Sequence, residues 1–360
     1  MEQKTIIHII YNLGRGGAET MLVQVLKELK EYRNIVIILF NENHFKEELE
    51  CEKLICLHLK SILSFPMAVF TLKKIIKKEK PDLVHSHLIW PTMMARLATP
   101  KNIPLITTIH TSVATSLDYK RWYIRFLDKA TYRFRKSIIL VVSKVAYQEY
   151  FSILKLKSYQ SHVLPTFVNV ERFKNASSGL HHPGPVFKVV AVGALSAQKN
   201  FSFLLNAFAI LSDKNIELHI YGKGDRQELL QNQIEETGAN VVLKGQVGSI
   251  EEILPQYDLY VMSSLFEGFS LSVLEAMAMR IPLLLSNIAS FKEQCEDGAL
   301  YFDLDKPSDF AEKLLQLKND NELRTSLAEN AFERVINNFT LSHHLQKLRA
   351  IYREAIEGND

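Results

Sequence analysis

A chain of 360 residues is long enough for two domains of ordinary size, and 47% hydrophobic against 23% charged residues is typical of a globular protein with a large core. The sequence has no run near the ~18 apolar residues of a membrane span, no signal-peptide pattern at its N-terminus and only three cysteines, without zinc spacing. We therefore expect a cytoplasmic protein, neither integral to a membrane nor stabilised by disulfides.

The small net charge hides an asymmetry between the two halves. Residues 1–167 contain 25 Lys and Arg against 14 Asp and Glu, a net of +11. Residues 168–360 contain 18 against 26, a net of −8. A basic half joined to an acidic half indicates that the first half faces an anionic partner.

The N-terminal pattern is strand, glycine turn, helix and strand, which opens a doubly wound α/β domain. Residues 5–13 (TIIHIIYNL) and 34–40 (NIVIILF) have the length and composition of buried strands. Between them, Gly14-Arg-Gly-Gly-Ala-Glu19 resembles a dinucleotide-binding turn, but Glu19 stands where the third glycine belongs, which disfavours a NAD-dependent dehydrogenase. The turn is either a simple βα connection or a place where Gly16 and Gly17 let a ligand approach the backbone.

Histidines follow two of the next predicted strands. A helix at residues 64–80 carries outward lysines, and the strand at 81–87 then ends in His85-Ser-His87. His110 ends the strand at 103–110, at the edge where open α/β sheets bind ligands. Alternation places His85 and His87 on one face, but no third ligand lies nearby in the sequence, so we expect no metal site.

A helix predicted at residues 119–136 combines two stripes. Seven cations against one anion occur in residues 120–136. The helix either lies on an anionic membrane surface or packs on the core with a solvated basic face. Nucleic acid is a weaker third choice, because no recognised nucleic-acid module accompanies the patch. The basic stripe is Arg121, Arg125, Lys129, Arg133 and Lys136, and the adjacent stripe is Trp122, Phe126, Ala130 and Phe134.

The second half repeats the strand–helix rhythm. We place an N-terminal domain at 1–167, a linker rich in Ser, Gly, His and Pro at 168–185, and a C-terminal domain at 186–340. A last helix at 341–360 is expected to pack back toward the N-terminal domain. The predicted fold class is α/β, with two facing doubly wound, Rossmann-like domains and a cleft between them.

Residues 265–277 (LFEGFSLSVLEAM) form the most informative turn. A strand leads into it, Gly268 lies within it, and a helix follows, so backbone N–H groups and the positive end of the helix dipole attract an anion such as phosphate. Glu267 and Glu275 would repel phosphate and are better suited to accept hydrogen bonds from hydroxyls. A phosphorylated sugar offers both groups. The alternative is that the pairs Ser272–Glu275 and Ser264–Glu267, which have the same spacing, are only helix-capping boxes.

Six motifs, in the order in which they occur along the chain, resemble those of the retaining, nucleotide-sugar-dependent glycosyltransferases of family 4, which have the GT-B fold. The likeness covers essentially the whole chain and is most specific from residue 192 to 302. The E-x7-E pair Glu267–Glu275 and the strand-end His110 match the family's residues. The other matches are Gly16-Gly-Ala-Glu19, Gly193 with Lys199-Asn200, Gly222-x-Gly224, and Glu275-Ala-Met-Ala278 with Pro282.

The resemblance implies a role for each matching residue. Lys199 pairs with the donor diphosphate, Glu267 accepts from sugar hydroxyls and Glu275 accepts from the ribose. His110 lies near the donor sugar. No metal ion or other cofactor is needed. The implied catalytic residues are His110, Lys199 and Glu267, and the acceptor side has Gly16, Gly17 and His87. The backbone N–H groups of Phe269, Ser270 and Leu271 bind the distal phosphate. The full set of implied donor-binding residues is Gly193, Lys199, Gly224, Arg226, Glu267, Gly268, Phe269, Ser270, Leu271 and Glu275.

Three positions depart from the family pattern. Ala194 replaces an arginine that would be the second diphosphate cation. Either Arg226 or Arg15 substitutes for it, or turnover is low. Ser270 and Arg280 each replace a glycine.

The expected activity is transfer of a sugar from a nucleotide-diphosphate donor, UDP favoured over GDP, with retention of configuration. The expected acceptor is lipid-linked or a polysaccharide in cell-surface polysaccharide biosynthesis, reached peripherally at the inner face of the cell membrane. The alternatives are a nucleotide-sugar epimerase of the same fold and a non-catalytic binding subunit.

Overall fold

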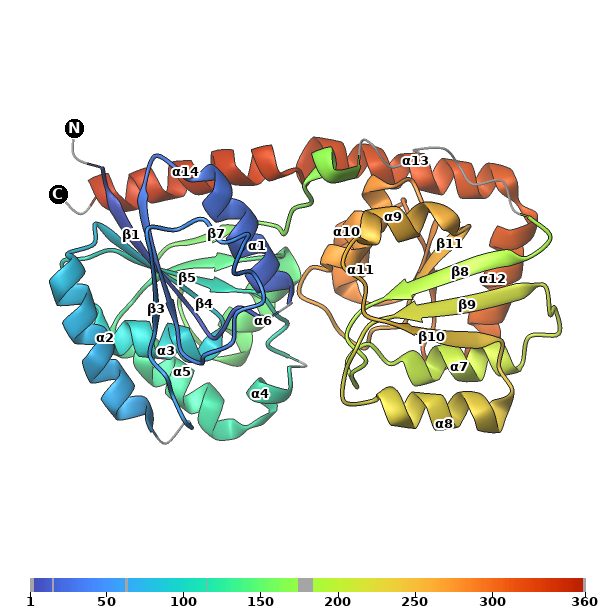
Figure 1. Ribbon diagram of the computed structural model, residues 1–360, viewed down its shortest axis with the longest axis horizontal. Helices are drawn as coiled ribbons and strands as arrows, with labels where there is room; N and C mark the ends of the chain where they lie inside the picture. The colour runs from blue at the N-terminus through green and yellow to red at the C-terminus, as the bar shows by residue number, and fades with distance from the viewer. Residues whose placement is uncertain (1–2, 15, 62–63, 115, 174–183, 359–360) are drawn as a thin grey trace. The chain divides into compact units, whose positions relative to one another are not determined.

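The computed structural model describes residues 3–14, 16–61, 64–114, 116–173 and 184–358 (Figure 1). The chain divides into two compact units, one of residues 1–166 with 342–360 and the other of residues 167–341. Most of the connector expected at 168–185 lies outside the described residues.

The first unit is built on seven parallel strands. Their order is β3-β2-β1-β4-β5-β6-β7, so the direction of winding reverses between β1 and β4. The central strands are buried on both faces, as expected for a parallel sheet covered by helices on each side. The strands are β1 (Thr5–Ile10), β2 (Arg33–Ile38), β3 (Lys53–Cys56), β4 (Leu83–His87), β5 (Leu105–Ile109), β6 (Ile138–Val141) and β7 (Ser161–Val163).

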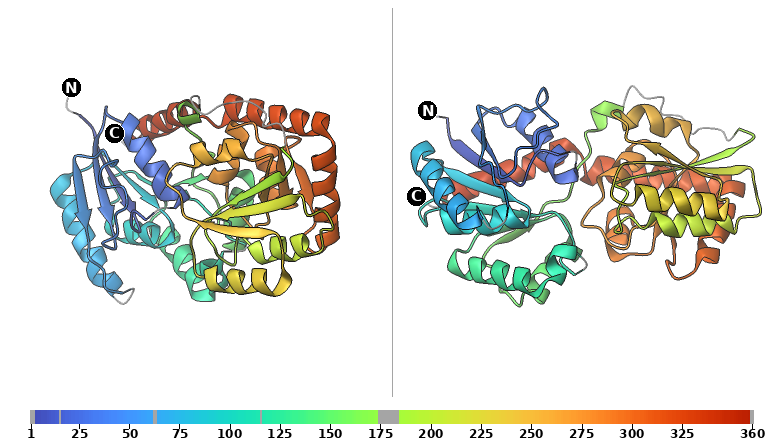
Figure 2. Two further views of the ribbon diagram at one scale, coloured as in Figure 1. Left: turned by 45° about the vertical axis from the view of Figure 1, so that its right-hand side comes forward. Right: turned by 60° about the horizontal axis from the view of Figure 1, so that its bottom comes forward.

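Strand alternation distributes the helices of this unit over the two faces of the sheet (Figure 2). Ile7 and Ile37 pack against α2 (Phe65–Glu79) and α3 (Ile89–Ala98), whereas Ile10 and Ile38 pack against α1 (Gly17–Glu28). The hydroxyl of Tyr352 bonds to β4, which shows that α14 packs on this unit. The other helices are α4 (Leu117–Lys120), α5 (Trp122–Phe134), α6 (Lys144–Ile153) and α14 (Leu341–Glu357).

The basic helix differs from the prediction in two ways. It is broken at Arg121, whose backbone is extended, into the single turn α4 and the longer α5. The face of α5 that packs inward carries Ile124, Asp128, Thr131 and Tyr132, so the predicted aromatic stripe is not the packing face. Asp128 is buried because it pairs with the buried guanidinium of Arg96 on α3.

The second unit repeats the architecture with six parallel strands. Their order is β10-β9-β8-β11-β12-β13, so the winding reverses between β8 and β11. Both units therefore confirm the predicted Rossmann-like domains. The strands are β8 (Phe187–Val192), β9 (Ile216–Tyr221), β10 (Val241–Gly245), β11 (Leu259–Met262), β12 (Leu283–Ser286) and β13 (Leu300–Phe302); the helices are α7 (Phe201–Ala209), α8 (Gln227–Thr237), α9 (Ile250–Ile253), α10 (Leu271–Ala278), α11 (Ala289–Cys295), α12 (Pro307–Asn319) and α13 (Asn321–Asn338), with short 3-10 turns η2 (Val170–Phe173) and η3 (Leu254–Gln256).

Candidate active site

The switch point of the second sheet brings two loops together. One loop follows β8 and contains Gly193 and Lys199; the other follows β11 and contains Glu267. Open α/β sheets bind ligands beyond the carboxyl ends of the two strands at such a reversal. The topology alone therefore places the predicted donor residues at the expected binding edge.

Two glycines let a neighbouring loop approach this edge. A Cβ on Gly222 would lie 1.8 Å from the carbonyl oxygen of Gly193, and one on Gly224 would lie 2.2 Å from that of Leu195. The G-x-G motif is thus required by contact between the loops after β8 and β9. Arg226, two residues on, donates its backbone N–H to Leu195, and its side chain is exposed.

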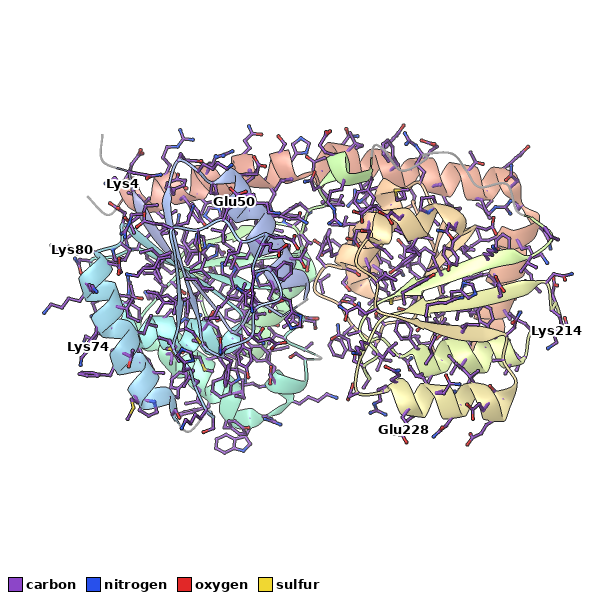
Figure 3. The ribbon with its side chains drawn as sticks, viewed as in Figure 1. Lys4, Glu50, Lys74, Lys80, Lys214 and Glu228 are labelled. Carbon is purple, nitrogen blue, oxygen red and sulfur yellow. The ribbon has the colours of Figure 1, made fainter. Side chains whose placement is uncertain are left out.

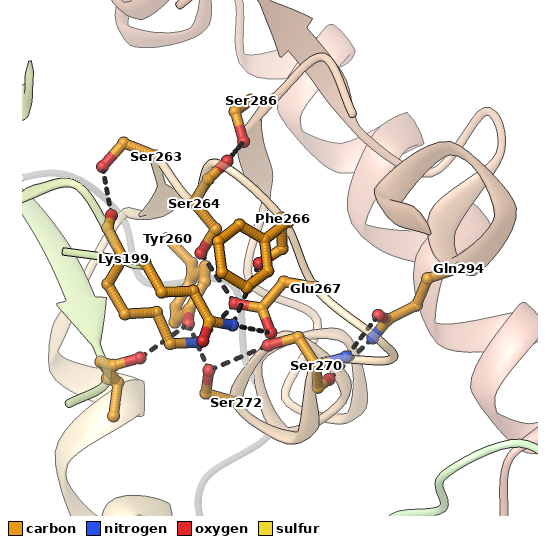
Figure 4. Close-up of polar contacts among 12 residues, drawn as sticks. Lys199, Tyr260, Ser263, Ser264, Phe266, Glu267, Ser270, Ser272, Ser286 and Gln294 are labelled. Atoms are coloured by element: carbon orange, nitrogen blue, oxygen red, sulfur yellow. Dashed lines mark hydrogen bonds and ion pairs between the residues drawn. The ribbon is translucent and has the colours of Figure 1, made fainter. Parts of the chain in front are cut away.

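Lys199 and Glu267 form the polar centre of the site (Figure 4). Lys199 Nζ lies 2.6 Å from Glu267 Oε1, and both side chains are largely buried. The hydroxyl of Ser264 donates to the same carboxylate oxygen over 2.8 Å, and the amide of Gln198 lies 3.3 Å from the other oxygen. A Cβ on Gly193 would lie 3.0 Å from the Lys199 side chain, so this glycine makes room for the lysine.

Further bonds hold the backbone on either side of the ion pair. The hydroxyl of Ser263 donates to the carbonyl oxygens of Lys199 and Asn200, each over 3.0 Å. Asn200 has φ 51° and starts α7 from the left-handed conformation that asparagine tolerates. The lysine therefore projects from a fixed loop onto a fixed carboxylate.

The turn before α10 rules out the capping alternative. The helix begins at Leu271 with Ser270 as its N-cap residue, and Ser270 makes no side-chain capping bond. Ser272 and Glu275 are therefore inside the helix, and Glu267 bonds to Lys199 and Ser264 instead of a helix terminus. The capping-box interpretation of both glutamates is wrong.

Gln294 fixes the same turn through the backbone of Ser270. Its side-chain amide accepts from the N–H of Ser270 over 2.9 Å and donates to its carbonyl over 2.8 Å. The N–H of Ser270, one of the three predicted phosphate donors, is thus already bonded, while Leu271 opens the first turn of α10. Gly268 is buried in the turn, and Phe269 packs edge-on against Phe339 at 5.0 Å between ring centroids.

The serine substitution fits the backbone, whereas the arginine stands in a conformation that favours glycine and is held by its side-chain contacts. Ser270 has φ −83°, so replacing the family's glycine introduces no strain there. Arg280 has φ 53°, which is the left-handed region where glycine is easiest to accommodate. Its guanidinium stacks 3.4 Å from the ring centroid of Phe332 and bonds to Glu329, contacts that hold the side chain in place.

Glu275 lies on α10 in a partly buried position. Burial raises the pKa of this carboxyl to about 7; Arg172 opposes the rise and Glu251 adds to it. The protonated form of Glu275 is therefore more favoured than in an exposed glutamate. Nearby, the hydroxyl of Tyr260 bonds to Ser272 over 2.9 Å.

The remaining predicted residues belong to the first unit. His110 follows β5, and its Nε2 lies 3.3 Å from Nδ1 of His87 at the end of β4. Burial is the main cause that lowers the pKa of His110 to about 4, and of His87 well below its usual range. Gly16 precedes α1 and Gly17 is its first residue, with no atom near enough to exclude a side chain at Gly17. Arg15 lies outside the described residues.

Several partners were not predicted from the sequence. Gln198 directly precedes Lys199, and Ser263 and Ser264 lie within four residues of Glu267, so their neighbourhood was a usable signal. Gln294 lies on α11, beyond the motif, and nothing in its local sequence indicates that it holds the Ser270 backbone.

Comparison with known proteins assigns the family. Residues 15–172 match the family model "Glycosyltransferase Family 4", and residues 173–334 match "Glycosyl transferases group 1". The chain belongs to the group 1 glycosyltransferases. The predicted donor-binding residues all lie within the second match. No helix within the described ranges is long and apolar enough to cross a membrane.

Relatives of this glycosyltransferase cover most of its length. A Campylobacter jejuni N-acetylgalactosaminyltransferase named for a diphospho-undecaprenol-linked acceptor is 27% identical, over 94% of this chain and 95% of its own. An Escherichia coli α-1,3-galactosyltransferase named for UDP-Gal and a GlcNAc-diphosphoundecaprenol is 24% identical, over 82% and 81%. The Anabaena protein HepE, solved with UDP and glucose, has a TM-score of 0.84 at 17% identity over 96% and 98% of the two chains, which shows the shared fold.

Proposed function

We propose that this glycosyltransferase moves a hexose-type sugar from a UDP-sugar to a lipid-linked or polysaccharide acceptor, with retention of configuration. The names of the Campylobacter and Escherichia relatives support a diphospho-lipid acceptor, and that of the latter a UDP donor. The observation that carries the proposal is the Lys199–Glu267 ion pair, held at the switch point beside the first turn of α10.

The ion pair prepares the site for an anionic leaving group. A donor diphosphate takes the place of Glu267 beside Lys199, and the released carboxylate then accepts hydrogen bonds from sugar hydroxyls. As the bond from the anomeric carbon to the phosphate oxygen breaks, negative charge develops on the diphosphate, and Lys199 stabilises it most in the transition state.

Retention follows if both steps occur on one face of the sugar. The acceptor oxygen bonds to the anomeric carbon on the side from which the diphosphate leaves, and the departing phosphate oxygen takes the acceptor proton. Neither glutamate acts as a nucleophile. Lys199 and the first-turn N–H groups of α10 supply the positive field, so the transfer needs no metal ion.

Glu267→Gln tests this assignment directly. The amide keeps the shape but not the charge, so we expect transfer to fall at least tenfold while the affinity for free UDP is kept or rises, since Lys199 loses its competing anion. Calorimetric titration with UDP and turnover of a panel of nucleotide sugars measure both effects, and the anomeric configuration of the product tests retention. An exposed Glu228→Gln variant on α8 is the control. Normal turnover in Glu267→Gln would remove Glu267 from the mechanism.

We further propose that the first unit docks on the anionic inner face of the cell membrane. The aromatic stripe of α5 points outward: Trp122 is 76% exposed, Phe126 62% and Phe134 65%. Exposed aromatic rings beside a row of cations fit a membrane interface, where apolar tips enter the headgroup region and cations contact anionic lipid.

A second helix supports the same surface. α3 contacts both α2 and α5 (Figure 1). On α2, Met67 and Phe70 are 75% and 59% exposed, and the exposed Lys74 lies 4.5 Å above the ring of Phe70. Lys80, which is also exposed, follows the last residue of the helix (Figure 3). Two helices on one side of the sheet thus combine exposed apolar side chains with positive charge.

Vesicle sedimentation tests the docking proposal. The protein should pellet with vesicles containing anionic lipid and detach as salt rises, because the attraction is screened within about 10 Å at 0.1 M salt. Replacing Arg121, Arg125 and Lys129 with Gln should weaken binding by roughly 1 kcal/mol per charge. The matched control replaces three cations of the second unit, Lys214, Lys223 and Lys244. Equal binding to neutral and anionic vesicles would contradict the proposal.

A further inference from the structure

Three histidines lie together at the switch point of the first sheet. His8 is on β1, and the register of β1 against β4 pairs it with His85; His87 follows two residues later on the same face. The ring centroids of His8 are 5.8 Å from His85 and 6.0 Å from His87, and those of His85 and His87 are 4.1 Å apart. One ring nitrogen from each residue lies within 4.8 Å of the other two.

Two of these buried rings have a nitrogen with no hydrogen-bond partner in the structure. They are Nδ1 of His8 and Nε2 of His87, in side chains that are 0% and 7% exposed. Leaving a buried polar atom unsatisfied costs about 1–3 kcal/mol. Two such atoms in one cluster point to a ligand between them.

The other ring nitrogens are held as in metal sites. His8 Nε2 lies 3.2 Å from the side-chain oxygen of Asn34, and His87 Nδ1 contacts His110. Both nitrogens of His85 have hydroxyl partners, Tyr352 at 2.6 Å and Thr108 at 2.7 Å, so either can turn to a ligand while the other stays held. Metal-binding histidines characteristically have their second nitrogen fixed by a polar partner.

Burial also keeps the rings in the form that binds metals. It is the main cause that lowers the pKa of His8 to about 4 and of the two β4 histidines well below the usual range, so all three are neutral at physiological pH. A neutral imidazole offers a lone pair, and three imidazoles select zinc, cobalt, nickel or copper over magnesium or calcium.

We propose that His8, His85 and His87 bind one divalent transition-metal ion, with zinc as the reference ion. The histidines line a cavity of about 30 Å³ whose other walls include Ala18, Met21 and Leu22. This space admits an ion with one bound water as fourth ligand, and a hydroxide there would offset part of the ion's charge. Tetrahedral coordination at 2.0–2.1 Å brings the nitrogens to roughly 3.3 Å from each other, which requires small rotations of the rings.

The ion would also set the tautomer of His110. A metal on Nε2 of His87 leaves the proton on Nδ1, which then donates to Nε2 of His110. His110 must in turn carry its own proton on Nδ1 and present it as a donor. This last consequence rests on the proposed function, which places His110 near the donor sugar; metal binding itself does not.

Metal titration of the full-length protein tests the site. After dialysis against a chelator, Zn²⁺ and Co²⁺ are titrated by calorimetry and, for Co²⁺, by the visible absorption of tetrahedral cobalt. We expect one ion per chain and a rise in melting temperature. His8→Gln and His87→Gln should each weaken binding at least tenfold, whereas His44→Gln, at an exposed histidine of the same unit, should bind as the wild type.

The wild-type titration decides the proposal even if a variant folds poorly. No binding by the wild type would mean that the cavity holds only water, and binding that survives both cluster variants would place the ion elsewhere; either result overturns the site. UDP titration reports on Lys199 and α10 in the second unit. If the chelated protein still binds UDP while the wild type binds no metal ion, the metal site is refuted and the proposed function is not. The two ideas can therefore fail separately.

Discussion

Glu275→Gln provides a test of the donor site in which stability and function change in opposite directions. Glu275 is partly buried on α10, and burial raises the pKa of its carboxyl to about 7. Glutamine keeps the shape of the protonated carboxyl but cannot ionise. The substitution should therefore remove the cost of charging this buried group, and with it the acceptor for a ribose hydroxyl.

The magnitude follows from the difference between folded and unfolded chains. The ordinary pKa is 4.5, so from pH 4.5 to about 7 the unfolded chain has lost a proton that the folded chain keeps. Stability contributed by this group therefore falls as pH rises through that window. The interval of about 2.5 pH units, at 1.36 kcal/mol each, sets an upper limit near 3 kcal/mol. Partial solvent contact reduces it, and we expect about 1–3 kcal/mol.

The assay is urea unfolding of wild type and Glu275→Gln at pH 4.5 and pH 8. The two proteins should be about equally stable at the lower pH, and the variant should be more stable by about 1–3 kcal/mol at the higher pH. Glu322→Gln, at an exposed carboxyl in the first turn of α13, is the control. A variant that is destabilised equally at both pH values would show that Glu275 acts as a structural hydrogen-bond partner, and the reasoning would fail.

Nucleoside binding supplies the functional half of the test. Uridine is the probe because it lacks phosphates that titrate near pH 6. Affinity of the wild type should rise up to tenfold from pH 6 to 8 as Glu275 ionises and accepts from the ribose hydroxyls. Glu275→Gln should bind uridine more weakly than the wild type at pH 8 and without this pH dependence. Equal uridine affinity of both proteins at pH 8 would remove Glu275 from the nucleotide site.

Three further substitutions in the second unit should change catalysis, UDP affinity or stability. Lys199→Ala should lower kcat/KM about 100-fold, the scale for losing one electrostatic stabiliser, and near wild-type kinetics would exclude it. Ala194→Arg restores the family's second cation and should raise UDP affinity by calorimetry; no gain would mean that another cation fills that place. Gly222→Ala puts a methyl group against the neighbouring loop's carbonyl oxygen at 1.8 Å, so its urea midpoint should fall markedly. An unchanged midpoint would show that the loops separate freely.

The sequence predicted the fold well because its signals are local. Runs of β-branched residues, glycine turns and amphipathic helices recur in order, and the parallel sheets follow from that rhythm. The weak strand β3 and helix α3 were not predicted, because β3 is short and half-exposed and α3 is apolar nearly all round. The orientation of α5 was also beyond the pattern. Its buried face contains Asp128, which is inward only because Arg96, far along the chain, pairs with it.

The residues of the proposed donor site sit in motifs, whereas their partners from elsewhere in the chain could not be predicted from the sequence. Glu267, Glu275 and Lys199 are motif residues, although only the structure shows that Lys199 and Glu267 pair. The histidine cluster shows the limit most clearly. His85 and His87 have no further histidine in their own segment. His8, the third residue of the cluster, lies 77 residues before His85 in the chain and comes beside it because β1 and β4 are neighbours in the sheet.

The charge of the second unit explains why the two glutamates are held as they are. This half of the chain carries a net of −8 and yet binds, by our proposal, a diphosphate. An unpaired Glu267 and an ionised Glu275 would repel such a ligand in a largely buried site, where charges are poorly screened. Lys199 pairs with the first, and burial raises the pKa of the second to about 7, which favours its protonated form. In the proposed complex, the donor therefore meets a site with less negative charge than two ionised carboxylates would carry. Once the donor is bound, its hydroxyls donate hydrogen bonds to both carboxylates and favour their ionised forms.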